Sequence, residues 1–276
     1  MRGKSAHQIE GGIGIIGCGH LGRALAEVLI DSGYPKEMLR VSYGGSSSTL
    51  EKIKRAGLLE NVSDNEEICR RSSVIFITVR PQSLEILKDL SFPGSALVVS
   101  CIAGVSRATL ERMVGVNVFR MMPSGPDTIE ERRGVAAVYP HDDALQEILS
   151  LMGLTVHELD DEELMHAFTV GLCLPAALLV AGKKGLDPSR CADDFGQKYP
   201  YLGEIGSWAR SVQPSFDSDE ARDEYIMRTA TRGGITEAMI DSLNRGCTFL
   251  TAIERGVSRS REIDDSWRKA VKCSRL

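Results

Sequence analysis

The sequence predicts an α/β protein with an N-terminal, Rossmann-type doubly wound parallel sheet, followed by a C-terminal all-helical domain. In the first half of the 276 residues, segments typical of strands and helices alternate, as in sheets built from right-handed crossovers. After the acidic run at residues 159–163 only helical periodicity remains. We therefore expect a polar tail at residues 1–11, an α/β domain at 12–159 and a helical domain at 160–276.

The first strand, around residues 13–16, runs into a glycine-rich turn that favours binding of a dinucleotide. Gly17 permits a tight turn, Gly19 lets the backbone approach a pyrophosphate, and Gly22 lets the following helix pack on the strand. The helix N-terminus adds free N–H groups and the positive end of its dipole. A plain tight turn is the alternative. The expected cofactor contacts here are Gly17, Cys18, Gly19, His20, Leu21 and Gly22.

The other strands of the sheet bring further loops to the same edge, where ligands bind in this architecture. Val74–Val79 is continuously apolar, as expected of a strand buried on both faces. Further strands are expected at 38–43, 96–100, 116–121, 135–139 and 154–158, and helices at 48–56, 82–90, 107–114 and 142–152. The candidate cofactor contacts that follow these strands are Val79, Arg80, Pro81, Ala103, Gly104 and Pro123, each of which could also belong to an ordinary loop.

The end of the second strand favours NADP over NAD, although NAD stays possible. An NAD site usually has an acidic residue here for the ribose 2′-hydroxyl, and residues 41–48 contain none. The hydroxyls of Ser46 and Ser47, followed by Lys52, would suit a 2′-phosphate. A flexible serine-rich loop without a ligand is the alternative. We assign the α/β domain as the NAD(P)-binding domain.

Bulk properties exclude several classes of protein. The net charge is −5 and no dense basic cluster is present, so we expect no nucleic-acid partner. No apolar stretch approaches the ~18 residues of a membrane span, because Pro175 interrupts the best candidate, Leu172–Ala181. The seven scattered cysteines form no C-x-x-C pair, and the five histidines have no metal-ligand spacing. We expect a metal-free cytoplasmic protein with a small-molecule substrate.

Three features stand out in the helical half. The segment Gly171–Ala176 contains Pro175, which should break or kink its helix. Residues 231–236 place a glycine pair and a threonine before a helix, and the N–H groups there could hold a substrate carboxylate or form a plain cap. Asp160 and Glu163 have the spacing of a capping box, which we favour over a pair of catalytic carboxylates.

Taken in order, four segments resemble the motifs of the pyrroline-5-carboxylate reductase family, which reduces a cyclic imine with NAD(P)H to complete proline biosynthesis. The segments are Thr78–Gln82, Ser100–Gly104, Arg120–Pro126 and Thr231–Thr236, and the resemblance extends from residue 13 to about 263. It implies that Thr236, at the last position of the family's "SPGGTT", hydrogen-bonds the ring nitrogen. It also implies a homodimer, or a higher homo-oligomer, formed through the helical domain. The expected substrate contacts are Gly233, Gly234, Ile235, Thr236, Cys173 and Pro175.

The sequence departs from the family motifs around the expected substrate. The family's "SGSGPA" is replaced by Gly-Leu-Cys-Leu-Pro-Ala at residues 171–176, and Arg232 stands at the proline of "SPGG". Pyrroline-5-carboxylate is therefore the expected substrate, with a more apolar cyclic imine as an alternative. A hydroxy-acid dehydrogenase is another alternative, and it would need an acid/base such as Lys183 or Lys184. The third alternative is a non-catalytic NADP-binding regulator.

Overall fold

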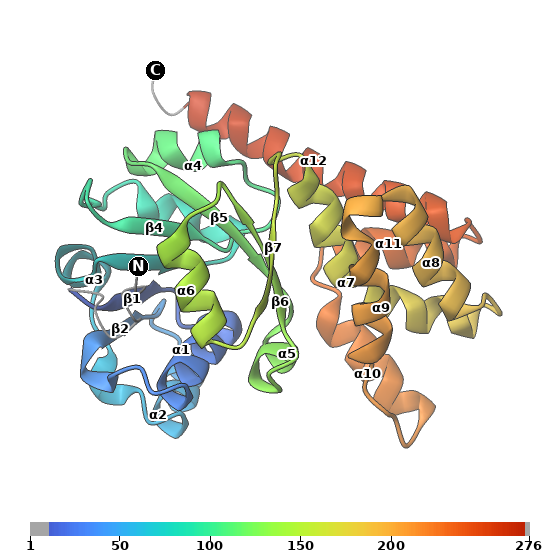
Figure 1. The fold of residues 1–276 in the computed structure, drawn as a ribbon, viewed down its shortest axis with the longest axis horizontal. Coiled ribbons are helices and arrows are strands. Elements are labelled where there is room, and N and C mark those ends of the chain that lie inside the picture. The colour runs from blue at the N-terminus through green and yellow to red at the C-terminus, as the bar shows by residue number, and fades with distance from the viewer. Residues whose placement is uncertain (1–10, 274–276) are drawn as a thin grey trace, which may run out of the picture. The chain divides into compact units, whose positions relative to one another are not determined.

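The computed structural model describes residues 11–273, which form two compact units (Figure 1). The N-terminal unit contains the residues up to Glu162 together with those from Ala270 onward, and the helical unit is Glu163–Lys269. Residues 1–10 of the expected polar tail lie outside the described residues. That the first unit binds the cofactor, and that the second binds substrate and dimerises, stay predictions.

The N-terminal unit contains a seven-stranded sheet with the order β2-β1-β3-β4-β5-β6-β7. Neighbouring strands are parallel except for β5 and β6. The predicted class, a mostly parallel α/β sheet followed by a helical region, is confirmed. The strands are β1 (Ile13–Ile16), β2 (Leu39–Ser42), β3 (Val74–Ile77), β4 (Leu97–Ser100), β5 (Val118–Pro123), β6 (Val135–Tyr139) and β7 (Thr155–Glu158).

The expectation that all strands run parallel is wrong at β6, which pairs antiparallel to β5 with Met121 opposite Val138. The connection between them, residues 124–134, contains only the short helix α5 (Pro126–Glu130). A parallel crossover needs about a dozen residues or more, so this connection can only reverse the chain. The longer connection after β6, which contains α6 (Asp143–Leu151), restores parallel pairing with β7.

Helices cover the sheet on both faces. Helices α1 (His20–Asp31) and α6 share one apolar core with the strand residues Ile15 and Phe76. On the opposite face, α3 (Asn65–Arg71) packs so closely that a Cβ on Gly14 would lie 2.4 Å from Cγ2 of Ile68. The remaining helices of this unit are α2 (Ser47–Arg55) and α4 (Arg107–Val114), with short 3-10 turns η2 (Lys36–Met38), η3 (Leu59–Asn61) and η4 (Pro81–Leu87).

Short helical segments are where the sequence analysis is least accurate. The α-helix expected at 82–90 is the 3-10 helix η4, in which the N–H of Ser83 donates to the carbonyl of Arg80 at 2.8 Å. Helices α3 and α5 were not predicted. The N-cap signal was present for α3, since the Asp64 carboxylate accepts from the N–H of Glu67 at 2.6 Å.

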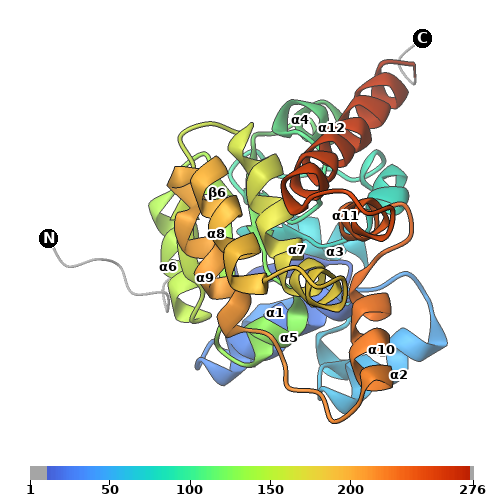
Figure 2. The same cartoon turned by 90° about the vertical axis from the view of Figure 1, so that its right-hand side faces the viewer.

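In the helical unit, α7 (Leu164–Lys183) contacts α8, α9, α10 and α11, and Figure 2 shows it among them. The other helices are α8 (Pro188–Lys198), the 3-10 turn η5 (Pro200–Leu202), α9 (Gly203–Ser211), α10 (Asp219–Thr229), α11 (Ile235–Asn244) and α12 (Phe249–Cys273), whose last residues belong to the N-terminal unit.

Of the two predicted effects of Pro175, a break or a kink, the break is wrong, because α7 continues through it. An internal proline costs about 3 kcal/mol relative to alanine. Leu174, Pro175 and Ala176 are all buried, so packing of α7 against its neighbours offsets this cost. The carbonyl of Pro175 accepts a hydrogen bond from Gln213 at 3.2 Å.

The sequence predicts no apolar stretch long enough for a membrane span, because Pro175 interrupts the best candidate. The unbroken helix α7 corrects this expectation. In the described part of the chain it is the one helix long and apolar enough to cross a membrane, yet 72% of its 18-residue window is buried. Buried core helices pass the same test of length and composition. Its length therefore says little about membranes.

The predicted capping box at the start of α7 is also wrong. The N-cap is Glu163, and no side chain caps the helix. The Glu162 carboxylate instead accepts from the N–H of Arg107 at 2.6 Å and from the guanidinium of Arg120 at 2.9 Å. Glu163 pairs with Arg261 at 3.3 Å. Both carboxylates therefore pair with residues distant in sequence and do not cap α7.

Candidate functional site

The carboxyl ends of neighbouring strands meet at one edge of the sheet. Ile16 of β1 is in register with Ser42 of β2 and with Ile77 of β3. Ile77 is in turn in register with Ser100 of β4, and Ser100 with Arg120 of β5. The residues that follow these positions therefore emerge side by side. They include the predicted cofactor contacts Gly17, Val79, Arg80, Pro81, Ala103, Gly104 and Pro123.

The three glycines of the first turn have different physical roles. Gly17 has φ +102°, and a Cβ there would lie 2.8 Å from Cγ1 of Val79. A Cβ on Gly22 would lie 2.6 Å from the Gly17 carbonyl oxygen. At Gly19, by contrast, the nearest atom is 3.9 Å away. The protein itself requires the first and third glycines, whereas the space beside Gly19 is open and fits a pyrophosphate.

The start of α1 adds donors for an anion. Its N-cap is Gly19, no side chain caps it, and Arg23 is the first residue whose N–H bonds back, to the Gly19 carbonyl at 3.1 Å. The N–H groups of His20, Leu21 and Gly22 therefore have no capping side chain. This is the arrangement in which helix N-termini bind phosphates.

Three polar side chains that the sequence analysis did not select hold this turn. Thr78 Oγ1 donates to the Gly17 carbonyl at 2.8 Å. Ser42 Oγ accepts from the Gly17 N–H at 3.3 Å and donates to Asn65 at 2.5 Å. Ser42 and Thr78 stand at the ends of the strands that flank β1, which is a signal that could have found them. Asn65 offers no such signal.

Cys18 is committed to the protein's own structure. Its side chain is 1% exposed and its N–H donates to the Ser42 carbonyl at 2.5 Å. Burial raises the pKa of its thiol to about 12, although Arg23 acts in the opposite direction. The thiol therefore stays protonated, and Cys18 shapes the turn without offering a polar group to a ligand.

The serine-rich segment after β2 forms the start of a helix. Ser46 is the N-cap of α2, Ser47 is its first residue, and both are exposed. The hydroxyls of Ser46 and Ser48 are 3.0 Å apart, and Lys52 is exposed one turn further on. Hydroxyls, a helix N-terminus and a nearby cation together form a fitting environment for a 2′-phosphate.

An ion pair between the buried Arg120 and the partly exposed Glu162 supports the loop that follows β4. Arg120 is 3% exposed and donates to Glu162 at 2.9 Å and to the Ile102 carbonyl at 3.2 Å. Ala103 and Gly104 follow directly, and Gly104 has φ +68°. Arg120 is the first residue of the resembling segment Arg120–Pro126, but the sequence predicts no role for it. In the structure it fixes the position of this loop.

The glycine pair in the helical unit opens α11, whose N-cap is Gly234 and which has no side-chain cap. The N–H of Gly234 donates to the Thr231 carbonyl at 2.8 Å, and that of Gly233 donates to the Glu237 carboxylate at 2.5 Å. Both groups are thus engaged within the protein. Ile235 and Thr236 are left as the N–H groups of this segment that suit a ligand carboxylate.

The structure brings Thr236 and Cys173 together. Burial raises the pKa of the Cys173 thiol to about 11, and a hydrogen bond from Thr236 opposes this rise. The sulfur also lies 3.3 Å from the Thr169 carbonyl. Leu172 and Cys173 are half-buried, whereas Leu174 and Pro175 are buried in the unit. In residues 171–176, the segment that departs from the family motif, Leu172 and Cys173 are therefore the residues that are not fully buried.

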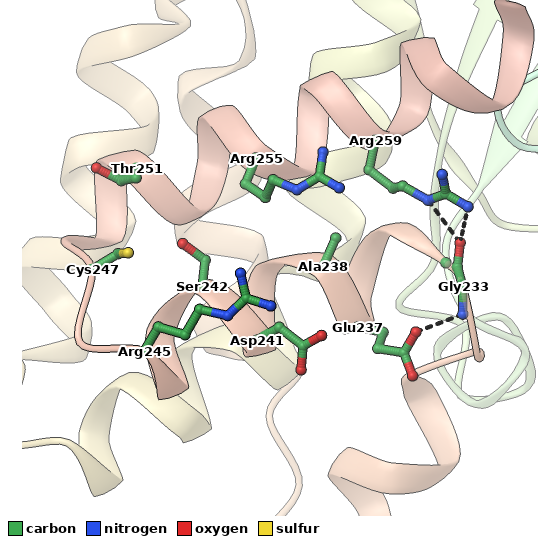
Figure 3. Close-up of a pocket in the computed structure, with 11 residues that line it drawn as sticks. Gly233, Glu237, Ala238, Asp241, Ser242, Arg245, Cys247, Thr251, Arg255 and Arg259 are labelled. Carbon is green, nitrogen blue, oxygen red and sulfur yellow. Dashed lines mark hydrogen bonds between the residues drawn. The ribbon is translucent and has the colours of Figure 1, made fainter.

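A cavity of about 360 Å³ lies on another face of α11 (Figure 3). Gly233 and Gly234 line it, whereas Thr236 is not among its lining residues. Its charged lining comes from α11 and α12: Glu237, Asp241, Arg245, Arg255 and Arg259.

The structure gives little support to other chemistries. Lys183 and Lys184 are exposed at the end of α7, and Lys183 pairs with Asp223. Within residues 11–273 no group of three or more His, Cys, Asp and Glu side chains is arranged to hold a metal ion. Cys18, Cys69, Cys101, Cys173, Cys191 and Cys247 are free thiols.

Comparisons with known proteins identify relatives along nearly the whole chain. Residues 12–104 match the family described as "NADP oxidoreductase coenzyme F420-dependent". The chain is 30% identical to pyrroline-5-carboxylate reductase 3 of Danio rerio over 280 residues, which cover 93% of each protein. It is 35% identical to a pyrroline-5-carboxylate reductase of Methanosarcina acetivorans over 173 residues, which cover 57% of this chain and 61% of that protein.

Solved structures show the same fold. The Plasmodium falciparum pyrroline carboxylate reductase with NADP bound aligns with a TM-score of 0.57 and 23% identity, covering 94% of this chain and 99% of that one. The Coxiella burnetii pyrroline-5-carboxylate reductase aligns with a TM-score of 0.55 and 21% identity, covering 91% and 97%.

The sheet, the glycine turn and the helical unit together define a class, the NAD(P)-dependent oxidoreductases with an N-terminal dinucleotide-binding sheet. The similarity along nearly the whole chain is more specific than the fold. The chain belongs to the pyrroline-5-carboxylate reductase family.

Proposed function

We propose that this protein reduces a cyclic imine that carries a carboxylate, with pyrroline-5-carboxylate and its product proline as the first candidates. The observation that carries the proposal is the start of α11. There a half-buried hydroxyl, that of Thr236, stands beside two N–H groups without a side-chain cap. One short segment thus offers an oxygen for a ring nitrogen and donors for a carboxylate.

The N-terminal unit would hold NADPH, which supplies the hydride for the imine carbon. The N–H groups of His20, Leu21 and Gly22 would bind the pyrophosphate beside the open space at Gly19. Ser46 and Ser47 would bind the 2′-phosphate. The NADP in the related Plasmodium structure supports this choice. NADH stays the second candidate.

Thr236 would act on the ring nitrogen. A hydroxyl oxygen has two lone pairs, so that of Thr236 could accept from the N–H of a protonated imine. A protonated imine is already activated for hydride addition, so the chain needs to supply orientation and exclusion of water more than a strong base. The substrate carboxylate would accept from the N–H groups of Ile235 and Thr236.

We also propose an alternative substrate, a cyclic imine with a more apolar ring. Leu172 and Cys173 stand where the family motif has glycine and serine, and both are half-buried at the side of α7. Larger and more apolar side chains at this position would suit a more apolar ring than that of pyrroline-5-carboxylate. Pyrroline-2-carboxylate and the piperideine carboxylates are the natural comparisons.

The alternative functions have weaker support. A hydroxy-acid dehydrogenase needs a positioned acid/base, and Lys183 is instead exposed and paired with Asp223. A non-catalytic NADP-binding regulator is motivated by the altered segment alone.

We also propose that the protein is at least a homodimer formed through its helical unit, which light scattering at micromolar concentration would test.

The test is the consumption of NADPH and of NADH with pyrroline-5-carboxylate, pyrroline-2-carboxylate and piperideine carboxylates. Thr236→Val should lower kcat on the preferred imine about 100-fold, because the variant loses the hydrogen bond that orients the ring for hydride transfer. Thr229→Val is the matched control, because its hydroxyl bonds carbonyls of its own helix α10. Turnover of none of these imines, with NADPH still bound, would favour the regulator.

A further inference from the structure

Charged side chains hold the peptide groups on both sides of Gly233. The Glu237 carboxylate accepts from the Gly233 N–H at 2.5 Å. From the opposite direction, Arg259 donates to the Gly233 carbonyl through Nε at 2.9 Å and through Nη2 at 2.7 Å. Figure 3 shows these contacts converging on the glycine from α11 and α12.

The Arg259 contact is specific to a guanidinium. Nε and Nη2 form a fork that embraces one carbonyl oxygen, and Nη1 lies 3.1 Å from the Glu262 carboxylate. Arg255 donates to the same carboxylate at 2.5 Å. Arg255 and Arg259 lower the pKa of the Glu262 carboxyl to about 2. A lysine at position 259 could not reproduce the fork.

An exposed turn does not need contacts from charged side chains to satisfy its peptide groups. Gly233 is exposed, so water could satisfy its peptide groups. Its φ of +69° lies in the left-handed region, where a glycine is otherwise free to change conformation. Fixing the groups on both sides of its Cα fixes that conformation. It also fixes the direction in which the chain enters α11.

The sequence departure at this turn supplies the reason for such contacts. The resembling family motif, "SPGG", has a proline directly before its glycines, which restricts the backbone. Here Arg232 occupies that position and is exposed, so the constraint is absent. Contacts from Glu237 and Arg259 can restore the rigidity that the proline would have given.

We propose that Arg259 and Glu237 are positioning residues that hold the Gly233–Gly234 turn in the form that presents the N–H groups of Ile235 and Thr236 to the substrate carboxylate. This inference rests on the proposed function. Neither residue acts on the reacting atoms. Both act through the turn.

The test compares Arg259→Met and Arg259→Lys with Arg255→Met. Arg255 lies one turn away on α12 and shares the Glu262 partner, but it donates to no atom of Gly233. Arg259→Met should raise the KM for the preferred imine carboxylate about tenfold, which corresponds to roughly 1.4 kcal/mol. Arg259→Lys should raise it by a smaller factor. The KM for NADPH should stay within twofold, and Arg255→Met should leave both constants within twofold.

Glu237 provides the conservative rescue. Glu237→Gln keeps an oxygen that can accept from the Gly233 N–H, so its KM should stay near that of the wild type, whereas Glu237→Ala should raise it. An unchanged KM in Arg259→Met, or an equal rise in Arg255→Met, would overturn the proposal. So would an equal rise in the KM values for the imine and NADPH, which would indicate a general loss of structure.

A second readout separates this proposal from the proposed function. Amide hydrogen exchange of residues 231–238 should become faster in Arg259→Met than in the wild type, and it should not change in Arg255→Met. If the wild type reduces none of the imines, the function fails while this measurement still reports on the turn. If exchange is the same in all three proteins, the positioning role is wrong whatever the activity.

Discussion

The two glycine turns of this protein open helices in a similar way but are held by different forces. Each has a glycine N-cap and no capping side chain, at Gly19 for α1 and at Gly234 for α11. The first turn is fixed by close packing, since a Cβ on Gly22 would meet the Gly17 carbonyl oxygen at 2.6 Å. The second also packs closely at Gly234, where a Cβ would lie 2.7 Å from the Thr231 carbonyl oxygen, but at the exposed Gly233 it is held by the charged groups of Arg259 and Glu237.

This difference decides how each turn responds to change. The steric contacts of the first turn reach Thr78 and Val79, but the glycines that they require stand at a characteristic local spacing, at Gly17 and Gly22. The Arg259 contact joins residues 26 positions apart, and no local pattern encodes it. Substitutions at Gly17 and Gly22 should therefore act on folding and cofactor binding together. Substitutions in the second turn should act on substrate binding alone.

The largest effect is expected for Gly22→Ala. Its Cβ would lie 2.7 Å from Thr78 Oγ1 as well as against the Gly17 carbonyl, so α1 must move away from the turn. Overpacking of this kind costs about 1–3 kcal/mol of unfolding free energy. We expect NADPH affinity to fall more than about 100-fold as the N–H groups shift.

Urea denaturation and fluorescence titration with NADPH measure these two effects. Gly94→Ala is the control, because nothing lies within 4 Å of the added Cβ and the backbone is not left-handed. Wild-type stability and affinity in Gly22→Ala would contradict the account of the first turn.

Gly19→Ala should separate binding from folding. Its Cβ would meet no atom of the protein closer than 3.9 Å, so the free energy of unfolding should change by less than about 0.5 kcal/mol. A methyl group would nevertheless occupy space expected for the pyrophosphate, and the Kd for NADPH should rise at least about tenfold. Unchanged affinity would indicate that this turn is not a cofactor turn.

A smaller effect is expected where the first turn meets the serine-rich segment. Ser46→Asp preserves an N-cap for α2 but places a carboxylate beside the expected 2′-phosphate. Repulsion between charges a few ångströms apart near a surface is worth about 1–4 kcal/mol, so preference for NADPH over NADH should fall at least about tenfold. Steady-state kinetics with both cofactors measure it, and Ser46→Asn controls for size. An equal loss with both cofactors would argue against a 2′-phosphate site.

The smallest effect concerns Cys173, beside the second turn. Because burial raises the pKa of its thiol to about 11, the thiol stays protonated from about pH 6 to about pH 9. The dependence of kcat on pH should therefore have the same shape in wild type and Cys173→Ser across this range. An inflection near pH 8 in the wild type alone would show that the thiol ionises there.

The same contrast between local and distant constraints explains what the sequence could predict. The helix Arg107–Val114 and the strand Val135–Tyr139 have the predicted limits, because periodicity and capping are local. The direction of β6 depends on the geometry of its connection, and the continuity of α7 through Pro175 depends on packing. Neither is visible in a local pattern.

The candidate site divides in the same way. The glycines of the first turn and the segment around Thr236 were identified from spacing and resemblance. Thr78, Arg120 and Arg259 support these segments from other parts of the chain, and their roles appear only once the fold brings their partners close. The sequence thus yields a prediction for the groups that would meet ligands, which stays a prediction, but none for the groups that hold these segments in place.

The most direct test of the account is to follow the hydride itself. NADPH with deuterium at the transferable position of its nicotinamide ring would be incubated with the protein and each cyclic imine carboxylate. Mass spectrometry would then locate the label in the amino-acid product. We predict one deuterium at the former imine carbon of at least one product. Recovery of every imine without a labelled product would contradict the assignment as an imine reductase.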